Sequence, residues 1–422
     1  MAVTSVPAAA ERTAAARPAP VRLESLTGLR WWAAFAVFLA HVDVLLPIPH
    51  TSGVFGLGVT GVTFFFVLSG FVLTWTATGA DTKGWFYARR FARIWPLLFL
   101  SVALPLVFAL TAKQVGTPVD KGHLVVIGVL SVLLVQAWVP GWILNGPSPV
   151  TWSLSCEAFF YLLFPFLLKP LARRAVRGLL WTALGLVLAG WAIRVGMWIK
   201  YPPKADITAD DFKKLGGLEL GTYSPIARLN EFVLGIAAAL VLRRVRRFPV
   251  SVRGAYALLA AGLFALWLVR KAVWRSQVPY DAVDQVCAPL FAVLIAAVAE
   301  RDLRGGRSRL ASRPLVRLGN WSYAFYLFQF TVLVAIAAKV FPDKGVPDFF
   351  LHPVAPAWSH TGYAVLALVI AIGLSALLYR RYEHPAERKL RAVLRGRLAR
   401  GGSEHVVQSA EQSAAKLAAE HA

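Results

Sequence analysis

Residues 25–47, SLTGLRWWAAFAVFLAHVDVLLP, form the stretch that decides the class of this protein. An apolar run of roughly 18 residues or more is long enough to cross a hydrocarbon core of about 30 Å as a helix. This run has that length, yet it carries Arg30 near its start and His41 near its end. An ionisable side chain inside a span is costly, so by default it indicates function. The stretch therefore predicts a transmembrane helix that carries part of a functional site.

The rest of the 422-residue chain repeats this apolar pattern. Its mean hydropathy is +0.59 and only 16% of its residues are charged, which does not fit a soluble protein of this length. We expect an all-α fold, a polytopic transmembrane helical bundle. The apolar segments cover approximately 29–47, 54–78, 94–111, 124–139, 152–168, 179–199, 224–242, 254–272, 282–299, 318–338 and 361–379.

Both ends of the chain differ in composition from this membrane domain, which we expect to cover residues 23–390. Residues 1–22 are rich in Ala and Pro and carry several charges, so they predict a disordered cytoplasmic tail and no cleaved signal peptide. Residues 391–422 predict a cytoplasmic C-terminal tail.

Basic residues gather in the loops between the apolar segments. Lys and Arg favour cytoplasmic loops, so these clusters set the orientation. We expect both termini in the cytoplasm and a multi-pass protein of the cell inner (plasma) membrane. The clusters are Lys83/Arg89/Arg90/Arg93, Lys169/Arg173/Arg174/Arg177, Arg243/Arg244/Arg246/Arg247/Arg253, Arg301/Arg304/Arg307/Arg309/Arg313/Arg317, and the run from Arg380 to Arg400.

This orientation leaves one conflict of parity. Two cytoplasmic clusters, ending at Arg93 and starting at Lys169, require an even number of crossings between them, but three apolar segments lie there. Segment 124–139 is the shortest and is followed by the helix-breaking run VPGWILNGPSPV. We therefore interpret it as re-entrant or partial, which leaves about ten spans.

The net charge of +23 raises the question of nucleic acid binding. The basic residues lie between membrane spans, so a soluble nucleic-acid binder is excluded and the expected surface partner is the lipid bilayer. Cys156 and Cys287 both lie inside apolar segments, which supports neither a metal site nor a disulfide framework.

Arg30 and His41 define one face of the first helix. They are eleven residues apart, which leaves them within about 20° of each other around the axis and about 16 Å apart along it. Arg30 then lies toward the cytoplasm and His41 in the outer half. The alternative is structural, with Arg30 reaching the headgroups and His41 hydrogen-bonded within the bundle.

Arg90 and Arg93 stand at positions i and i+3 near a helix start. This spacing places two guanidinium groups side by side, where they could grip a phosphate, with Arg89 adjacent. The alternative is an ordinary cytoplasmic anchor of a span.

Glu157 lies inside the apolar run TWSLSCEAFFYLLFPFLL and needs a partner there. His41 and Arg228 are both candidates. Arg228 and Glu231, at i and i+3, could instead pair with each other as structural glue.

Seven blocks in this order resemble the acyltransferase-3 family of membrane O-acyltransferases over about residues 22–390. They are LTGLRWWAA with His41 closing the first span, FFFVLSGF, the pair Arg90-x-x-Arg93, WSLSCEAFFYLLFP, RLNEFVLG, WSYAFYLFQF and YEHPAERKLR. The resemblance implies a bundle of about ten spans. It also implies an enzyme that takes acyl groups from cytoplasmic acyl-coenzyme A and acylates sugars, antibiotics or envelope glycans.

The resemblance further implies site residues. Arg30 and His41 match the family's essential Arg and His, Arg90 and Arg93 its cytoplasmic Arg-x-x-Arg motif, and Glu157 the acidic residue of its Trp-Ser-Leu block. One departure matters: family members commonly have His where this chain has Gln329 in YLFQF. An amide does not titrate, so we expect no proton transfer at this position.

A mechanism follows as a hypothesis. Arg90, Arg93 and Arg89 hold the coenzyme A phosphates, and the pantetheine arm passes Arg30. His41 acts as general base on the acceptor hydroxyl, with Glu157, in preference to Asp43, orienting the imidazole. No metal is expected. An acyl-enzyme on Cys156 is the less simple alternative, because no activating base adjoins it in sequence.

A membrane transporter or flippase without acyl transfer is the alternative from another functional class, since it too has many spans and buried charges. Against it, the two halves of the chain show no internal repeat. Within the enzyme class, a composition rich in Ala, Leu, Val, Arg and Gly suggests a GC-rich genome. Acceptors expected there are natural products such as macrolides, or cell-surface glycans.

Overall fold

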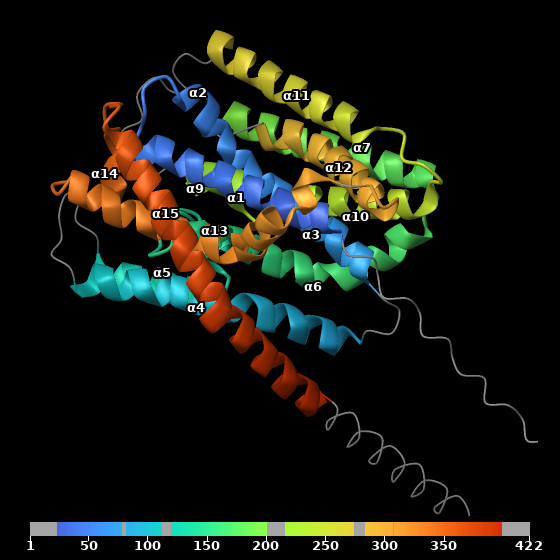
Figure 1. The fold of residues 1–422 in the computed structure, drawn as a ribbon, viewed down its shortest axis with the longest axis horizontal. Coiled ribbons are helices and arrows are strands. Elements are labelled where there is room, and N and C mark those ends of the chain that lie inside the picture. Colours follow the sequence, from blue (N-terminus) through green and yellow to red (C-terminus); the bar gives the residue numbers. More distant parts are fainter. Residues whose placement is uncertain are drawn as a thin grey trace, which may run out of the picture.

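The computed structural model describes residues 23–77, 82–111, 120–200, 216–273, 283–306 and 308–398. Within them every regular element is helical and no strand occurs, so the predicted all-α class is confirmed (Figure 1). The predicted N-terminal tail and residues 399–422 of the predicted C-terminal tail lie outside the described residues.

Eleven of the described helices correspond one to one with the predicted apolar segments. They are α1 (Glu24–Leu45), α3 (Thr60–Thr76), α4 (Lys83–Thr111), α5 (Lys121–Val132), α6 (Trp152–Arg173), α7 (Val176–Lys200), α10 (Leu229–Arg244), α11 (Val252–Val273), α12 (Val283–Leu303), α13 (Arg313–Val340) and α15 (His360–Leu378). Shorter pieces connect them, namely α2 (Ser52–Phe55), α9 (Gly216–Tyr223), α14 (Val346–Leu351) and several 3₁₀ turns.

Eight helices in the described part of the chain are long and apolar enough to cross a membrane. The ten predicted spans also include α10 and α11, which do not meet that criterion. Helix α10 has only 16 residues. The segment predicted to be partial is α5, whose 12 residues span about 18 Å, less than a bilayer core of about 30 Å. Leu134, just beyond α5, has a φ of +61°, in the left-handed region where the helix cannot continue.

The centre of the bundle is the contact between α3 and α10. A Cβ on Gly70 would lie 2.0 Å from the carbonyl oxygen of Phe232, and one on Gly235 would lie 1.9 Å from that of Val67. Two glycines facing each other therefore bring the backbones into direct contact, as small residues do between membrane helices. Beside this pair, α1 packs against α13, where Trp31 and Phe38 both contact the ring of Phe325.

The basic loops meet at one end of the bundle. Three arginines donate hydrogen bonds to carbonyl groups across these loops: Arg243 to Trp75, Arg244 to Arg174, and Arg304 to Arg246. At the other end, the amide of Ala357 donates to the carbonyl of Pro47 at 3.1 Å, tying the start of α15 to the end of α1. The loops that carry these arginines and the junction between α1 and α15 therefore lie at opposite ends of the bundle.

The last helix runs obliquely across the others in Figure 1. It begins as α15, passes through a π-helical turn, η5 (Tyr379–Glu383), and continues as a helix to Leu398. The predicted tail beginning at residue 391 thus starts as helix. The turn η5 lies against α4 and α13, which brings acidic residues of the C-terminal helix to the basic end of the bundle.

Candidate active site

Helices α1, α3, α4, α6 and α13 surround a pocket of about 190 Å³, here called the arginine pocket. Its polar lining combines cations, one carboxylate and several hydroxyl groups, and its remaining wall is apolar. The polar residues are Arg30, Ser69, Arg90, Arg93, Ser153, Glu157, Tyr161, Ser322, Tyr323 and Tyr326. Four of the six predicted site residues therefore come together in one place.

Helical spacing explains why these side chains share a wall. Ser153, Glu157 and Tyr161 follow one another at intervals of four along α6, and Arg90 and Arg93 stand three apart on α4. Residues three or four apart lie on the same face of a helix. On α4 and α6, one polar face of the helix therefore lines the pocket, and most of the apolar residues lie on the other faces.

Glu157 has partners other than the two that the sequence suggested. Its carboxylate interacts with Arg30 and Arg90 and lies next to the hydroxyl groups of Tyr161 and Ser69. The Ser69 hydroxyl also donates to that of Tyr161 at 3.4 Å. Glu157 is therefore the counter-charge of the arginines in the pocket and is not placed beside His41 or Arg228.

Arg93 is held by the C-terminal helix. Its Nη1 lies 2.6 Å from Oε1 of Glu383 and 3.0 Å from Oε2 of Glu387. Glu383 is 1% exposed and occupies the last position of the π-helical turn η5, a kind of turn found frequently at functional sites. Two carboxylates thus already neutralise this member of the Arg-x-x-Arg pair.

Arg90 has a different environment from Arg93. Its guanidinium lies over the rings of Phe86 and Tyr161, with centroids 6.0 and 5.8 Å away. Among the described residues it forms no ion pair within 4 Å, although Glu157 is near enough to interact electrostatically. Arg89 points to another face, over the ring of Trp85. Arg90 is thus the cation of this motif that faces the pocket without a bound carboxylate.

His41 does not line the arginine pocket. Its Nδ1 lies 2.8 Å from Nε2 of Gln329, and its ring meets that of Phe330 edge-on with centroids 5.0 Å apart. Gln329 lies three residues beyond the pocket residue Tyr326, which is about 4.5 Å along the axis of α13. Because α1 is continuous, His41 stays about 16 Å from Arg30 along the axis. His41 therefore lies about one helical turn beyond the pocket, toward the predicted outer side.

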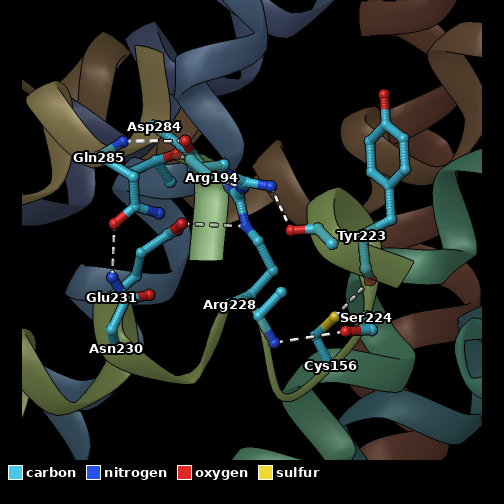
Figure 2. A network of polar contacts seen from close by, with 12 residues as sticks. Cys156, Arg194, Tyr223, Ser224, Arg228, Asn230, Glu231, Asp284 and Gln285 are labelled. Carbon is cyan, nitrogen blue, oxygen red and sulfur yellow. Dashed lines mark hydrogen bonds and ion pairs between the residues drawn. The ribbon is translucent and has the colours of Figure 1, made fainter. Parts of the chain in front are cut away.

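A second group of buried charges lies outside the pocket (Figure 2). Arg228 pairs with Glu231 at 3.0 Å and with Asp284, and Asp284 also pairs with Arg194. Two cations meet two anions, so the group is balanced, as a buried ion-pair network requires. The interpretation of Arg228 and Glu231 as structural glue fits this arrangement, which links α7, α10 and α12.

Sequence reasoning missed four acidic or basic residues of these two groups: Arg194, Asp284, Glu383 and Glu387. A signal existed for Asp284, which stands at the start of an apolar helix. Glu383 and Glu387 lie in the basic run from Arg380 to Arg400, whose charge predicts only a cytoplasmic cluster, whereas their i, i+4 spacing fits one face of a continuing helix. Cys156 is buried, and its thiol donates to the carbonyl of Tyr223 at 3.3 Å. No group of three metal-ligating side chains gathers in the part of the chain that the structure describes.

Comparison with known proteins places the chain in a family. The family described as acyltransferase domain matches residues 23–380. The chain is 36% identical over 400 residues to acyltransferase MdmB of Streptomyces mycarofaciens, covering 88% of this chain and 94% of that protein. It is 26% identical to nodulation protein 10 of Rhizobium leguminosarum bv. viciae, covering 74% and 83%. It is 25% identical to peptidoglycan O-acetyltransferase OatA of Listeria monocytogenes, covering 73% of this chain and 49% of that one.

No solved structure gives a significant match to the chain. The family match covers nearly all of the described helical bundle and includes every predicted site residue. The chain therefore belongs to the acyltransferase-3 family.

Proposed function

We propose that this protein is a multi-pass membrane enzyme that moves an acyl group from acyl-coenzyme A to a hydroxyl of a sugar, natural product or envelope glycan. The observation that carries the proposal is the gathering of Arg30, Arg90 and Glu157 in one pocket, with His41 about one turn beyond it. A negatively charged donor would bind at the arginines, and the base for the acceptor hydroxyl would lie further along α1.

The donor end of the site is the basic end of the bundle. Coenzyme A carries phosphates, which guanidinium groups bind through paired hydrogen bonds. We assign Arg90 to the phosphates, with Arg89 on the adjacent face, because Arg90 faces the pocket without a bound carboxylate. Arg93 contributes mainly by shaping the pocket, because Glu383 and Glu387 already hold its guanidinium. Arg30 lies further along the path of the pantetheine arm.

The chemical step is direct transfer at His41. The imidazole takes the proton of the acceptor hydroxyl, the oxygen attacks the thioester carbonyl, and a new C–O bond forms as the C–S bond breaks. The imidazolium then returns its proton to the leaving thiolate, so coenzyme A leaves as a free thiol. Glu157 balances the charge of Arg30 and Arg90, a role that replaces the orienting role suggested from the sequence.

The supporting experiment follows thiol release from radiolabelled acetyl- and longer acyl-coenzyme A by protein in nanodiscs, with an extract of hydroxyl acceptors. Wild type should transfer label to a product, and His41→Ala should not. Arg253→Gln is the matched control, because Arg253 is an exposed arginine on α11, outside the pocket. If wild type consumes no acyl-coenzyme A with any acceptor but moves solutes across vesicles, the transporter alternative replaces this proposal.

A further inference from the structure

The contact between His41 of α1 and Gln329 of α13 joins two helices beside the base of the proposed mechanism. Gln329 is completely buried on α13, and its amide lies 2.8 Å from Nδ1 of His41 on α1. The ring of Phe330, the next residue on α13, meets the imidazole edge-on. The histidine is therefore oriented by a group that cannot carry a charge or accept its proton.

The orientation of this amide decides which imidazole nitrogen bears the proton. If the NH₂ group donates to Nδ1, the neutral ring must carry its proton on Nε2, and no lone pair remains for a base. If the amide turns by 180°, its carbonyl accepts from Nδ1–H and the lone pair of Nε2 is free. With the NH₂ group toward His41, Oε1 of Gln329 is buried without a hydrogen-bond partner. The turned amide would let this oxygen accept the hydrogen bond of Nδ1–H and would place the NH₂ group where Oε1 lies.

We propose that Gln329 is a positioning residue that holds His41 in the Nδ1–H tautomer through its carbonyl, so that Nε2 serves as the base. The inference rests on the proposed acyl transfer, and it adds which nitrogen of His41 acts as the base. Gln329 does this without moving a proton itself. The hydrogen bond in a Ser-His-Asp triad fixes a tautomer in the same way, there through a carboxylate.

Two nearly isosteric variants of Gln329 distinguish a role in positioning His41 from a purely structural role. Gln329→Glu offers only acceptor oxygens, and Gln329→Met offers neither donor nor acceptor of comparable strength. The Met variant should lower kcat at least about tenfold, within the factor of 10²–10⁴ that a general base contributes, with the KM for acyl-coenzyme A within about twofold of wild type. The Glu variant should recover activity toward higher pH, because a carboxylate beside the imidazole stabilises its charged form.

A matched control measures the structural cost of losing a buried amide. Gln285 is also buried and hydrogen-bonded, to Asn230 at 2.7 Å, but lies in the charge network outside the pocket. Gln285→Met should lower thermal stability as much as Gln329→Met while leaving kcat near wild type. If Gln329→Met keeps wild-type kcat, or if the Glu and Met variants lose kcat equally at every pH, Gln329 does not set the base.

A spectroscopic readout makes the inference independent of activity. In protein labelled with ¹⁵N-histidine, the His41 signals are identified by their loss in His41→Asn. Wild type and Gln329→Glu should show a protonated Nδ1, and Gln329→Met should show a mixture of tautomers. A protonated Nε2 in wild type overturns the inference, even if the enzyme transfers acyl groups. Failure of wild type to transfer any acyl group, with the Nδ1–H tautomer present, would instead refute the proposed function.

Discussion

At the scale of single residues, the two arginines of one short motif have different partners. Arg93 is bound by Glu383 and Glu387, whereas Arg90 faces the pocket over the ring of Tyr161. Their spacing of three residues puts both on one face of α4, but the helices that pack there decide what each can bind. The pair should therefore respond differently to the same substitution.

Arg90→Gln should raise the KM for acyl-coenzyme A by about 10- to 100-fold, because a hydrogen bond to a charged group contributes about 1.5–3 kcal/mol. A donor without the 3′-phosphate is the test ligand. If Arg90 binds that phosphate, the variant and wild type should differ much less with this donor. An equal penalty with both donors would assign Arg90 to another part of the donor or to the fold.

Arg93→Gln should act mainly on stability. It leaves the buried carboxylate of Glu383 without its ion pair, and breaking a buried pair typically costs about 3–5 kcal/mol; Glu387, which also contacts Arg391, is less affected. We expect a lower melting temperature in nanodiscs, partly restored when Glu383→Gln is added. A variant that melts like wild type but has a much higher donor KM would show that Arg93 binds the phosphate after all.

At the scale of elements, backbone contact and buried charge hold the central helices together. Gly70 and Gly235 allow α3 and α10 to touch, and Asp284 of α12 joins Arg194 of α7 to Arg228, the residue that caps α10 (Figure 2). Arg228 also donates to Thr63 of α3 at 2.9 Å. The charge network and the glycine contact therefore act on the same helices.

Gly235→Ala should destabilise the bundle strongly. The added Cβ would lie 1.9 Å from the carbonyl oxygen of Val67, and backbone on both sides leaves no flexible atom to move. Gly373→Ala in α15 is the matched control, because no atom other than the neighbouring backbone of its own helix lies within 4 Å of the position of its Cβ. Thermal unfolding in nanodiscs should show a large decrease for the first variant and little change for the second. Equal melting temperatures would contradict the close α3–α10 contact.

Asp284→Leu should also be destabilising, since it leaves Arg194 and Arg228 with less buried counter-charge than they need. Adding Arg194→Leu removes one cation and should recover part of the loss, a coupling that a double-mutant cycle measures. Glu24→Leu, at an exposed position on α1, is the control for adding an apolar side chain. Additive losses would indicate that the two residues do not act as a pair.

At the scale of the whole molecule, the basic loops meet at one end of the bundle, and the orientation that they predict is open to a direct test. Cys156 and Cys287 are both buried, so they should not react with a membrane-impermeant thiol reagent. Arg247→Cys should be labelled only from the cytoplasmic face of sealed vesicles. Trp358→Cys, whose side chain is 67% exposed at the opposite end, should be labelled only from outside. Labelling in the reverse sense would invert the topology.

The sequence alone determined the apolar segments, the partial nature of α5 and the basic loops, and it offered the pairing of Arg228 with Glu231 as one of two alternatives. Segment length, loop charge and helical spacing are local properties, and the membrane acts on them directly. Ten spans were predicted and eight meet the criterion of length and hydropathy, because a short helix such as α10 is supported by its neighbours.

Only the tertiary structure decided which polar groups meet. A charge inside a span indicates that a partner must exist, since burial without one is too costly, but it does not indicate which helix supplies that partner. In the fold, Glu157 interacts with Arg30 and Arg90. Arg93 forms an ion pair with Glu383, and His41 contacts Gln329. Each choice depends on helices far apart in the chain packing side by side, which no spacing within one helix can fix.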